Sequence, residues 1–100
     1  MIDIHFIVNP IAGKGKSSIT ETILKPFFID SLYRLVIKQS AFKKHATQLT
    51  KDSIAEKADI IVACGGDGTI NEVARCLVGS NIPLGIIPMG SGNGLASNLN

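Results

Sequence analysis

The sequence lacks tryptophan, has only five aromatic residues, and is only 18% charged over its 100 residues. Surfaces that bind single-stranded nucleic acid depend on aromatic stacking, so this composition argues against one. The net charge of +2 is too small to indicate a polyanionic partner. No apolar run approaches the roughly 18 residues of a membrane span, and Asp3 and His5 interrupt any signal peptide. We therefore expect neither a nucleic-acid partner nor a transmembrane segment.

Cysteine is also scarce. Cys64 and Cys76 both lie in apolar contexts, and their spacing fits no common zinc pattern. We interpret both as reduced core residues of a cytoplasmic protein. The chain is 45% apolar, which is typical of a well-buried globular domain, and its length corresponds to a single domain covering residues 1–100.

Glycine is concentrated in three segments, each of which follows a short apolar run: residues 9–18, 64–69 and 89–94. Such clusters occur where the backbone needs a positive φ or where a ligand approaches it closely. Between a strand and a helix, the free N–H groups and the helix dipole favour a phosphate. Neither standard motif fits, since Pro10 breaks the Walker A pattern and Ser18 and Asn71 break the dinucleotide fingerprint. We therefore predict phosphate binding through another kind of loop.

Hydrophobic patterning predicts alternating strands and helices. Strands are expected at residues 2–8, 33–38, 59–64 and 84–87, with the third most central and the second shorter or more peripheral. Helices are expected from Ser17 or Ser18 to about Phe28, with an end or kink at Pro26, then at 44–57 and 69–78, and from Leu95 onward. This alternation predicts an α/β domain with a parallel sheet and flanking helices. The three glycine segments would then meet at the carboxyl edge of the sheet, where ligands bind.

Three motifs in order carry a family resemblance: Asn9-Pro10 with Gly13-Lys14-Gly15-Lys16, then Gly65-Gly66-Asp67-Gly68-Thr69-Ile70-Asn71-Glu72, then Pro88-Met89-Gly90-Ser91-Gly92-Asn93-Gly94. Together they resemble the diacylglycerol kinase catalytic family, which includes bacterial diacylglycerol and other lipid kinases, sphingosine kinases and ceramide kinases. The middle motif is also similar to those of phosphofructokinases and NAD kinases. The resemblance covers nearly the whole chain but only the amino-terminal domain of the family.

The resemblance implies a phosphofructokinase-like and NAD-kinase-like nucleotide-binding domain that uses ATP with Mg²⁺ bridging phosphate oxygens. The acceptor would be a lipid alcohol met at a membrane surface, which implies a cytoplasmic kinase of phospholipid or other lipid metabolism, peripheral at the inner face. The β-rich second domain of the family is absent from these 100 residues, so we expect the chain to be inactive alone. Leu95 and Leu99 would leave apolar surface uncovered, which predicts a homodimer or aggregation.

The resemblance assigns nucleotide contacts to Asn9, Pro10, Gly13, Ser40, Gly65, Gly66, Asp67, Gly68, Thr69, Asn71, Glu72, Gly90, Ser91 and Gly92. Asp67 is the candidate catalytic residue, acting on the nucleotide's metal or on the acceptor hydroxyl, although an Asp here also commonly caps a helix. Lys14 and Lys16 can equally be solvated loop lysines, and no cluster of protein metal ligands is expected.

Some positions depart from the family pattern. Ser40 stands where the family usually has Thr, and its hydroxyl can still bind a phosphate. Lys44 replaces Gly or Asn, so we expect a changed turn and interpret His45 as a helix-start residue. Ser91 matches sphingosine and ceramide kinases, but this is too small a difference to name the lipid. A soluble-substrate kinase of the NAD kinase type and a non-catalytic nucleotide-binding module remain alternatives.

Overall fold

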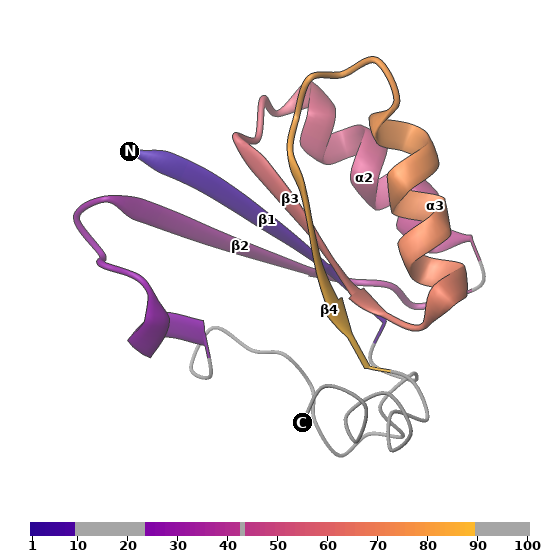
Figure 1. The fold of residues 1–100 in the computed structure, drawn as a ribbon, viewed down its shortest axis with the longest axis horizontal. Coiled ribbons are helices and arrows are strands. Elements are labelled where there is room, and N and C mark those ends of the chain that lie inside the picture. Colours follow the sequence, from indigo (N-terminus) through magenta and orange to yellow (C-terminus); the bar gives the residue numbers. More distant parts are fainter. Residues whose placement is uncertain (10–23, 43, 90–100) are drawn as a thin grey trace.

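The computed structural model describes residues 1–9, 24–42 and 44–89. Along the chain these residues form β1 (Ile2–Val8), the 3-10 turn η2 (Lys25–Phe27), β2 (Tyr33–Gln39), α2 (His45–Ala55), β3 (Ile60–Gly65), α3 (Asp67–Leu77) and β4 (Leu84–Pro88) (Figure 1). The four strands form one sheet in the order β2-β1-β3-β4, and every pair is parallel. The predicted α/β class with a parallel sheet is therefore confirmed.

Two details of the sheet differ from the sequence prediction. β3 is internal as expected, but β1 is internal too, so the two strands share the centre of the sheet. β2 lies at an edge, as its charged ends indicate, yet it is as long as β1. All seven residues of β2 pair with β1, from Ile2 with Tyr33 to Val8 with Gln39, so the edge strand is not shortened.

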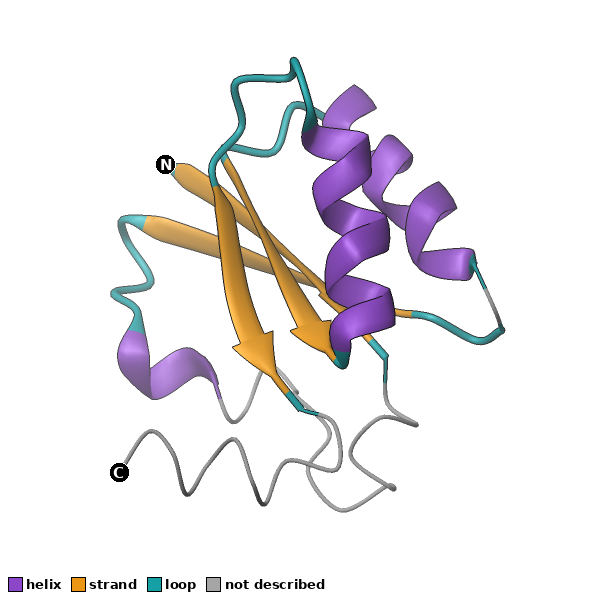
Figure 2. Ribbon diagram, turned by 45° about the vertical axis from the view of Figure 1, so that its right-hand side comes forward, coloured by secondary structure: helices purple, strands orange, loops and turns teal. Residues whose placement is uncertain are grey.

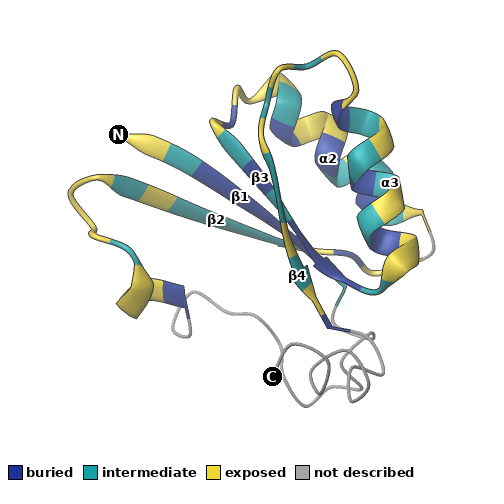
Figure 3. Ribbon diagram, viewed as in Figure 1, coloured by how far each residue is buried: buried dark blue, intermediate teal, exposed yellow. Residues whose placement is uncertain are grey.

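The helices α2 and α3 lie side by side on one face of the sheet (Figures 1 and 2). Val73 and Leu77 of α3 are buried against Ile61 and Ala63 of β3, and they recur at the spacing expected of one helix face. Ala46 begins the matching buried side of α2. Burial concentrates on β1 and β3 (Figure 3), because these strands have a neighbour on each side.

The other face of the sheet carries a second apolar cluster. Phe6 and Cys64 are buried there with Leu24, and Phe28 packs its ring edge-on against Phe6 at 6.2 Å between centroids. Pro26 lies in η2, and Phe28 after it is extended, in agreement with the predicted end of a helix at Pro26. Most of that predicted helix and the one from Leu95 lie outside the described residues.

A polar group is buried beneath α2, where the sequence pattern indicates only packing. His5 of β1 is 4% exposed, and its Nδ1 lies 2.7 Å from the hydroxyl of the fully buried Ser53. Glu56 lies 3.7 Å from the same nitrogen and accepts a 2.7 Å hydrogen bond from Lys38. Burial, with a smaller contribution from the Lys38 charge, lowers the pKa of His5 below its ordinary value. These contacts tie α2 to β1 and β2.

Candidate functional site

The carboxyl ends of all four strands lie at one edge of the sheet and are joined there by backbone hydrogen bonds. Ser40 N–H donates to Val8 O at 2.8 Å, linking the residue after β2 to β1. Asn9 N–H donates to Cys64 O and Met89 N–H to Gly65 O, both at 2.9 Å, which adds β3 and β4. The loops that leave these strands therefore begin next to one another. This is the edge at which open α/β sheets bind ligands.

The glycine segment at the end of β3 enters the helix earlier than predicted. Gly66 is the N-cap of α3 with φ −84° and ψ −174°, and Ile70 N–H donates to its carbonyl at 3.0 Å. Asp67 and Gly68 are thus the first two residues of α3, whereas the sequence interpretation placed both in the preceding turn. Gly65, Gly66 and Gly68 all lack a left-handed φ, so turn geometry does not explain this cluster.

The space around these glycines separates them into two kinds. A Cβ added at Gly65 would lie 2.9 Å from the Cβ of Thr69, so close packing inside the fold excludes a side chain there. A Cβ at Gly66 or Gly68 would meet nothing within 4 Å. These two positions leave the backbone of the first turn of α3 accessible. Glycine at such positions allows a ligand to approach the backbone closely.

Asp67 is exposed at the first position of α3, one residue after the N-cap, which is Gly66. A carboxylate here is favoured by the positive end of the helix dipole. The alternative capping role is therefore limited to this electrostatic effect. The carboxylate is exposed on the residue between Gly66 and Gly68.

Asn9 and Thr69, which are 60 residues apart in sequence, meet behind the start of α3. The Asn9 side-chain amide donates to Thr69 Oγ1 at 3.3 Å, while the Asn9 backbone is bonded to the end of β3. Thr69 is only 8% exposed. Of the predicted contacts, the structure thus brings Asn9, Gly65 and Thr69 together, with Thr69 on the inner side.

The loop before α2 keeps a backbone conformation that its sequence disfavours. Lys44 is left-handed, with φ 67° and ψ 4°, the region that Gly or Asn adopts readily. Lys44 therefore adopts a conformation that favours Gly or Asn, and the expectation that it changes the turn relative to the family stays a prediction. His45 is the first residue of α2, as predicted, and its Nδ1 accepts a 2.8 Å hydrogen bond from Ala41 N–H. Its ring also stacks on Phe42 at 4.2 Å.

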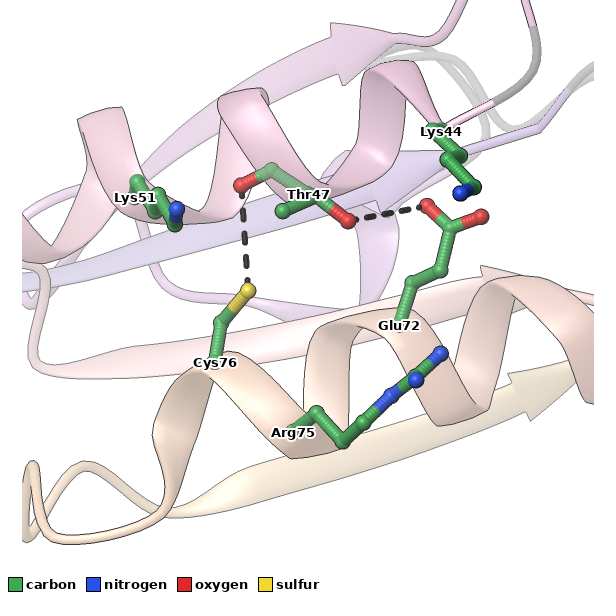
Figure 4. A pocket seen from close by; sticks show the side chains of 6 residues that line it. All are labelled: Lys44, Thr47, Lys51, Glu72, Arg75 and Cys76. Carbon is green, nitrogen blue, oxygen red and sulfur yellow. Dashed lines mark hydrogen bonds between the residues drawn. The ribbon is translucent and has the colours of Figure 1, made fainter.

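Glu72 faces a groove of about 410 Å³ between α2 and α3. Its carboxylate accepts a hydrogen bond from the Thr47 hydroxyl at 3.3 Å, and Lys44 and Arg75 extend from the two helices nearby (Figure 4). Lys51 and Cys76 line the groove further along the helices. The sequence prediction missed Thr47 and Arg75. The only available signal was helical spacing, since Arg75 follows Glu72 by three residues and Thr47 follows Lys44 by three.

The remaining predicted contacts are less closely grouped. Ser40 is nearly buried, 9% exposed, at the start of the loop after β2. Asn71 is exposed and borders a different hollow with Ala74 and Val78, so it does not share the groove of Glu72. A further group lies outside the described residues: Pro10, Gly13, Gly90, Ser91 and Gly92.

Both cysteines are free; Cys64 is buried in the core as predicted, whereas Cys76 is only partly buried beside the groove, so its assignment to the core is wrong. Burial raises the pKa of the Cys64 thiol to about 12, so this residue stays protonated in the core. Within residues 1–9, 24–42 and 44–89, no three His, Cys, Asp or Glu side chains are placed to hold a metal ion together. No helix in the same ranges is long and apolar enough to cross a bilayer.

The sheet and the residues at its carboxyl edge define the class of protein. It is a parallel α/β domain in which a helix with an open, glycine-lined start follows the carboxyl end of a strand. The family model for the diacylglycerol kinase catalytic domain matches residues 3–100. The chain is 33% identical over 100 residues to sphingosine kinase 1 of Arabidopsis thaliana, covering 92% of this chain and 21% of that protein. It is 35% identical over 96 residues to a diacylglycerol kinase of Bacillus subtilis, covering 92% and 31%.

A crystal structure of a diacylglycerol kinase from Bacillus anthracis superposes with a TM-score of 0.66 and 32% identity, covering 97% of this chain and 36% of that one. The chain belongs to the diacylglycerol kinase catalytic domain family, a family of kinases. It spans between 21% and 36% of the length of these three relatives.

Proposed function

We propose that this chain is the nucleotide-binding part of an ATP-dependent lipid kinase, which transfers the γ-phosphoryl group to a lipid hydroxyl. Family membership supports a kinase, and relatives named for diacylglycerol and for sphingosine support a lipid alcohol as acceptor. The relatives do not agree on one lipid, so the proposal names the class of acceptor only.

The observation that carries the nucleotide part of the proposal is the open start of α3. Gly66 and Gly68 leave the backbone open over the first helical turn, and the N-cap residue Gly66 has no side chain that could cap the turn's N–H groups. Such N–H groups, at the positive end of an 11-residue helix, are suited to phosphate oxygens. Phosphoryl transfer depends mainly on alignment and on stabilising charge, which backbone donors provide without reorganisation.

Mg²⁺ would bind at this edge together with the nucleotide, not in a site made of protein ligands alone. Mg²⁺ is commonly held by one or two carboxylates together with substrate phosphates and water. Asp67 is the exposed carboxylate beside the open glycines, so it would hold the ion, which would neutralise developing phosphate charge. A role of Asp67 as base toward the acceptor hydroxyl is the alternative. Glu72, bonded to Thr47, would lie at the side of the nucleotide.

We place the protein in the cytoplasm, with peripheral contact to the membrane that holds its substrate. The predicted homodimer depends on Leu95 and Leu99, which lie outside the described residues, so it stays a prediction. Light scattering tests it: a monomer at high concentration, unchanged by Leu99→Ser, would contradict dimer formation.

Calorimetry with Mg-ATP tests nucleotide binding by the chain. Binding should be weak, in the millimolar range, and lost in Gly68→Val, whose branched Cβ would fill the open space beside the first turn of α3. Gly79→Ala is a poor control because Gly79 has a φ of 81°. Lys25→Gln, an exposed change in η2, is the matched control and should bind as the wild type does. Equal heats for wild type and Gly68→Val would refute the proposed phosphate site.

Transfer of labelled phosphate to diacylglycerol or sphingosine in mixed micelles tests the kinase activity. We expect negligible turnover by the chain alone, and turnover when the rest of a family member is supplied. Asp67→Asn should abolish that turnover, whichever of its two roles applies. Nucleotide binding with no transfer in either condition would favour a non-catalytic module, and transfer to NAD would favour the soluble-substrate alternative.

A further inference from the structure

Thr69 lies in the glycine motif, but its surroundings distinguish it from the open residues around it. Its side chain is nearly buried, and it points back toward Gly65 and Asn9. The Cβ, Oγ1 and Cγ2 atoms of Thr69 all lie within 3.2 Å of the place where a Gly65 Cβ would be. Gly65 is therefore glycine because Thr69 fills the space above it.

The hydroxyl of Thr69 also contacts a second residue, Asn9. It accepts the 3.3 Å hydrogen bond from the Asn9 side-chain amide, whose backbone N–H is already bonded to Cys64 O of β3. Asn9 is thus bonded to β3 through its backbone and to α3 through its side chain. This arrangement fixes the first residue after β1 relative to the helix start that Gly66 and Gly68 leave open.

We propose that Thr69 is a positioning residue, which acts on the nucleotide through Asn9 and does not contact it. The inference rests on the proposed function, since it takes the carboxyl edge as the nucleotide site. It also revises the sequence interpretation, which placed Thr69 among the nucleotide contacts. Thr69 would act through its hydroxyl, because the hydroxyl accepts the hydrogen bond from the Asn9 side chain.

Two substitutions separate positioning from packing. Thr69→Ser keeps the hydroxyl and removes the methyl group, whereas Thr69→Val keeps the shape and removes the acceptor. If Thr69 positions Asn9, Mg-ATP affinity falls about fivefold in Thr69→Val, the usual effect of one lost hydrogen bond, and stays near wild type in Thr69→Ser. A packing role predicts the reverse order. Equal affinities in the two variants, or loss only in Thr69→Ser, would overturn the proposal.

A double substitution tests whether the effect passes through Asn9. In an Asn9→Ala background, Thr69→Val should cause no further loss of affinity, because the partner of the hydroxyl is already gone. Independent losses that multiply would show a direct role for Thr69 and so overturn the inference.

A measurement without nucleotide keeps this inference separate from the proposed function. The side-chain amide resonances of Asn9, identified by their loss in Asn9→Asp, should show faster hydrogen exchange in Thr69→Val but not in Thr69→Ser. Unchanged exchange in Thr69→Val would refute the positioning role even if ATP binds. Conversely, a wild-type chain that binds no ATP but shows this exchange pattern would refute the nucleotide site and leave the Thr69–Asn9 coupling intact.

Discussion

Gly65→Ala should destabilise the domain although it adds only one methyl group. The new Cβ would lie 2.9 Å from Thr69 Cβ, 3.0 Å from its Oγ1 and 3.2 Å from its Cγ2. All three atoms belong to the β-branched side chain of Thr69 on α3, which is stiff at χ1, so relief requires the helix to move away from β3. Overpacking of this kind costs about 1–3 kcal/mol. The lower entropy of the unfolded alanine chain offsets up to about 1 kcal/mol.

Gly68→Ala is the matched control, because the same substitution three residues later meets no atom within 4 Å. Gly68 lies in the first turn of α3 without a left-handed φ, so alanine should be neutral or stabilising by up to about 1 kcal/mol. Urea denaturation followed by circular dichroism gives both free energies of unfolding. In thermal melts, a loss of 1 kcal/mol corresponds to roughly 4–8 °C in a domain of this size.

The reasoning is refuted if Gly65→Ala and Gly68→Ala have the same free energy of unfolding within about 0.5 kcal/mol, the range of ordinary surface substitutions. It is also refuted if Gly68→Ala is the more destabilised of the two. Either result would mean that the contact between Gly65 and Thr69 does not limit the approach of α3 to β3.

Three further predictions concern other parts of the fold. Cys76 should react with a thiol reagent at pH 8 before Cys64, whose burial raises its pKa to about 12, and equal rates in the folded protein would contradict this. Lys44→Gly should raise the free energy of unfolding by up to about 1 kcal/mol by removing left-handed strain, and a lower value would show that the lysine is not strained. Because burial and Lys38 lower the pKa of His5, the unfolded chain takes up its proton first as pH falls through 6.5. The contribution of His5 to the free energy of unfolding should therefore be complete above about pH 6.5 and should decrease as the pH falls toward the lower pKa of the folded state. Urea denaturation at pH 7.5 and at pH 5.5 gives the free energy of unfolding at each pH. The difference between the two values should be smaller in His5→Asn than in the wild type, and an unchanged difference would mean that another group causes it.

The sheet could be predicted because its signals are local. The runs at 2–8 and 59–64 are rich in apolar residues and alternate little, which is typical of strands covered on both faces, and β1 and β3 are the internal strands. The face of α3 could be predicted for the same reason, since Val73 and Leu77 recur at helical spacing and are buried. The carboxyl edge then follows from parallel pairing alone.

The polar contacts could not be predicted, because they depend on partners far away in sequence. Ser53 lies on a buried side of α2 only because His5, 48 residues earlier, provides its hydrogen-bond partner. Nothing in the neighbourhood of either residue in the sequence indicates this pairing. The left-handed Lys44 was missed for a different reason: propensity disfavours it by about 1–2 kcal/mol, and the surrounding structure overrides that preference.

The glycine motif shows why a local pattern identifies a site without assigning its residues. Gly65, Gly66 and Gly68 are equivalent as sequence, and a positive φ was one of the two reasons considered for all of them. In the fold, Gly65 is required by a neighbour inside the molecule, while Gly66 and Gly68 face open space at the start of α3. Gly66 and Gly68 leave space beside the backbone that a ligand could enter, whereas Thr69 fills the corresponding space at Gly65. It follows that substitutions at Gly65 should change stability first and binding as a consequence, whereas substitutions at Gly68 should change binding while the fold remains intact.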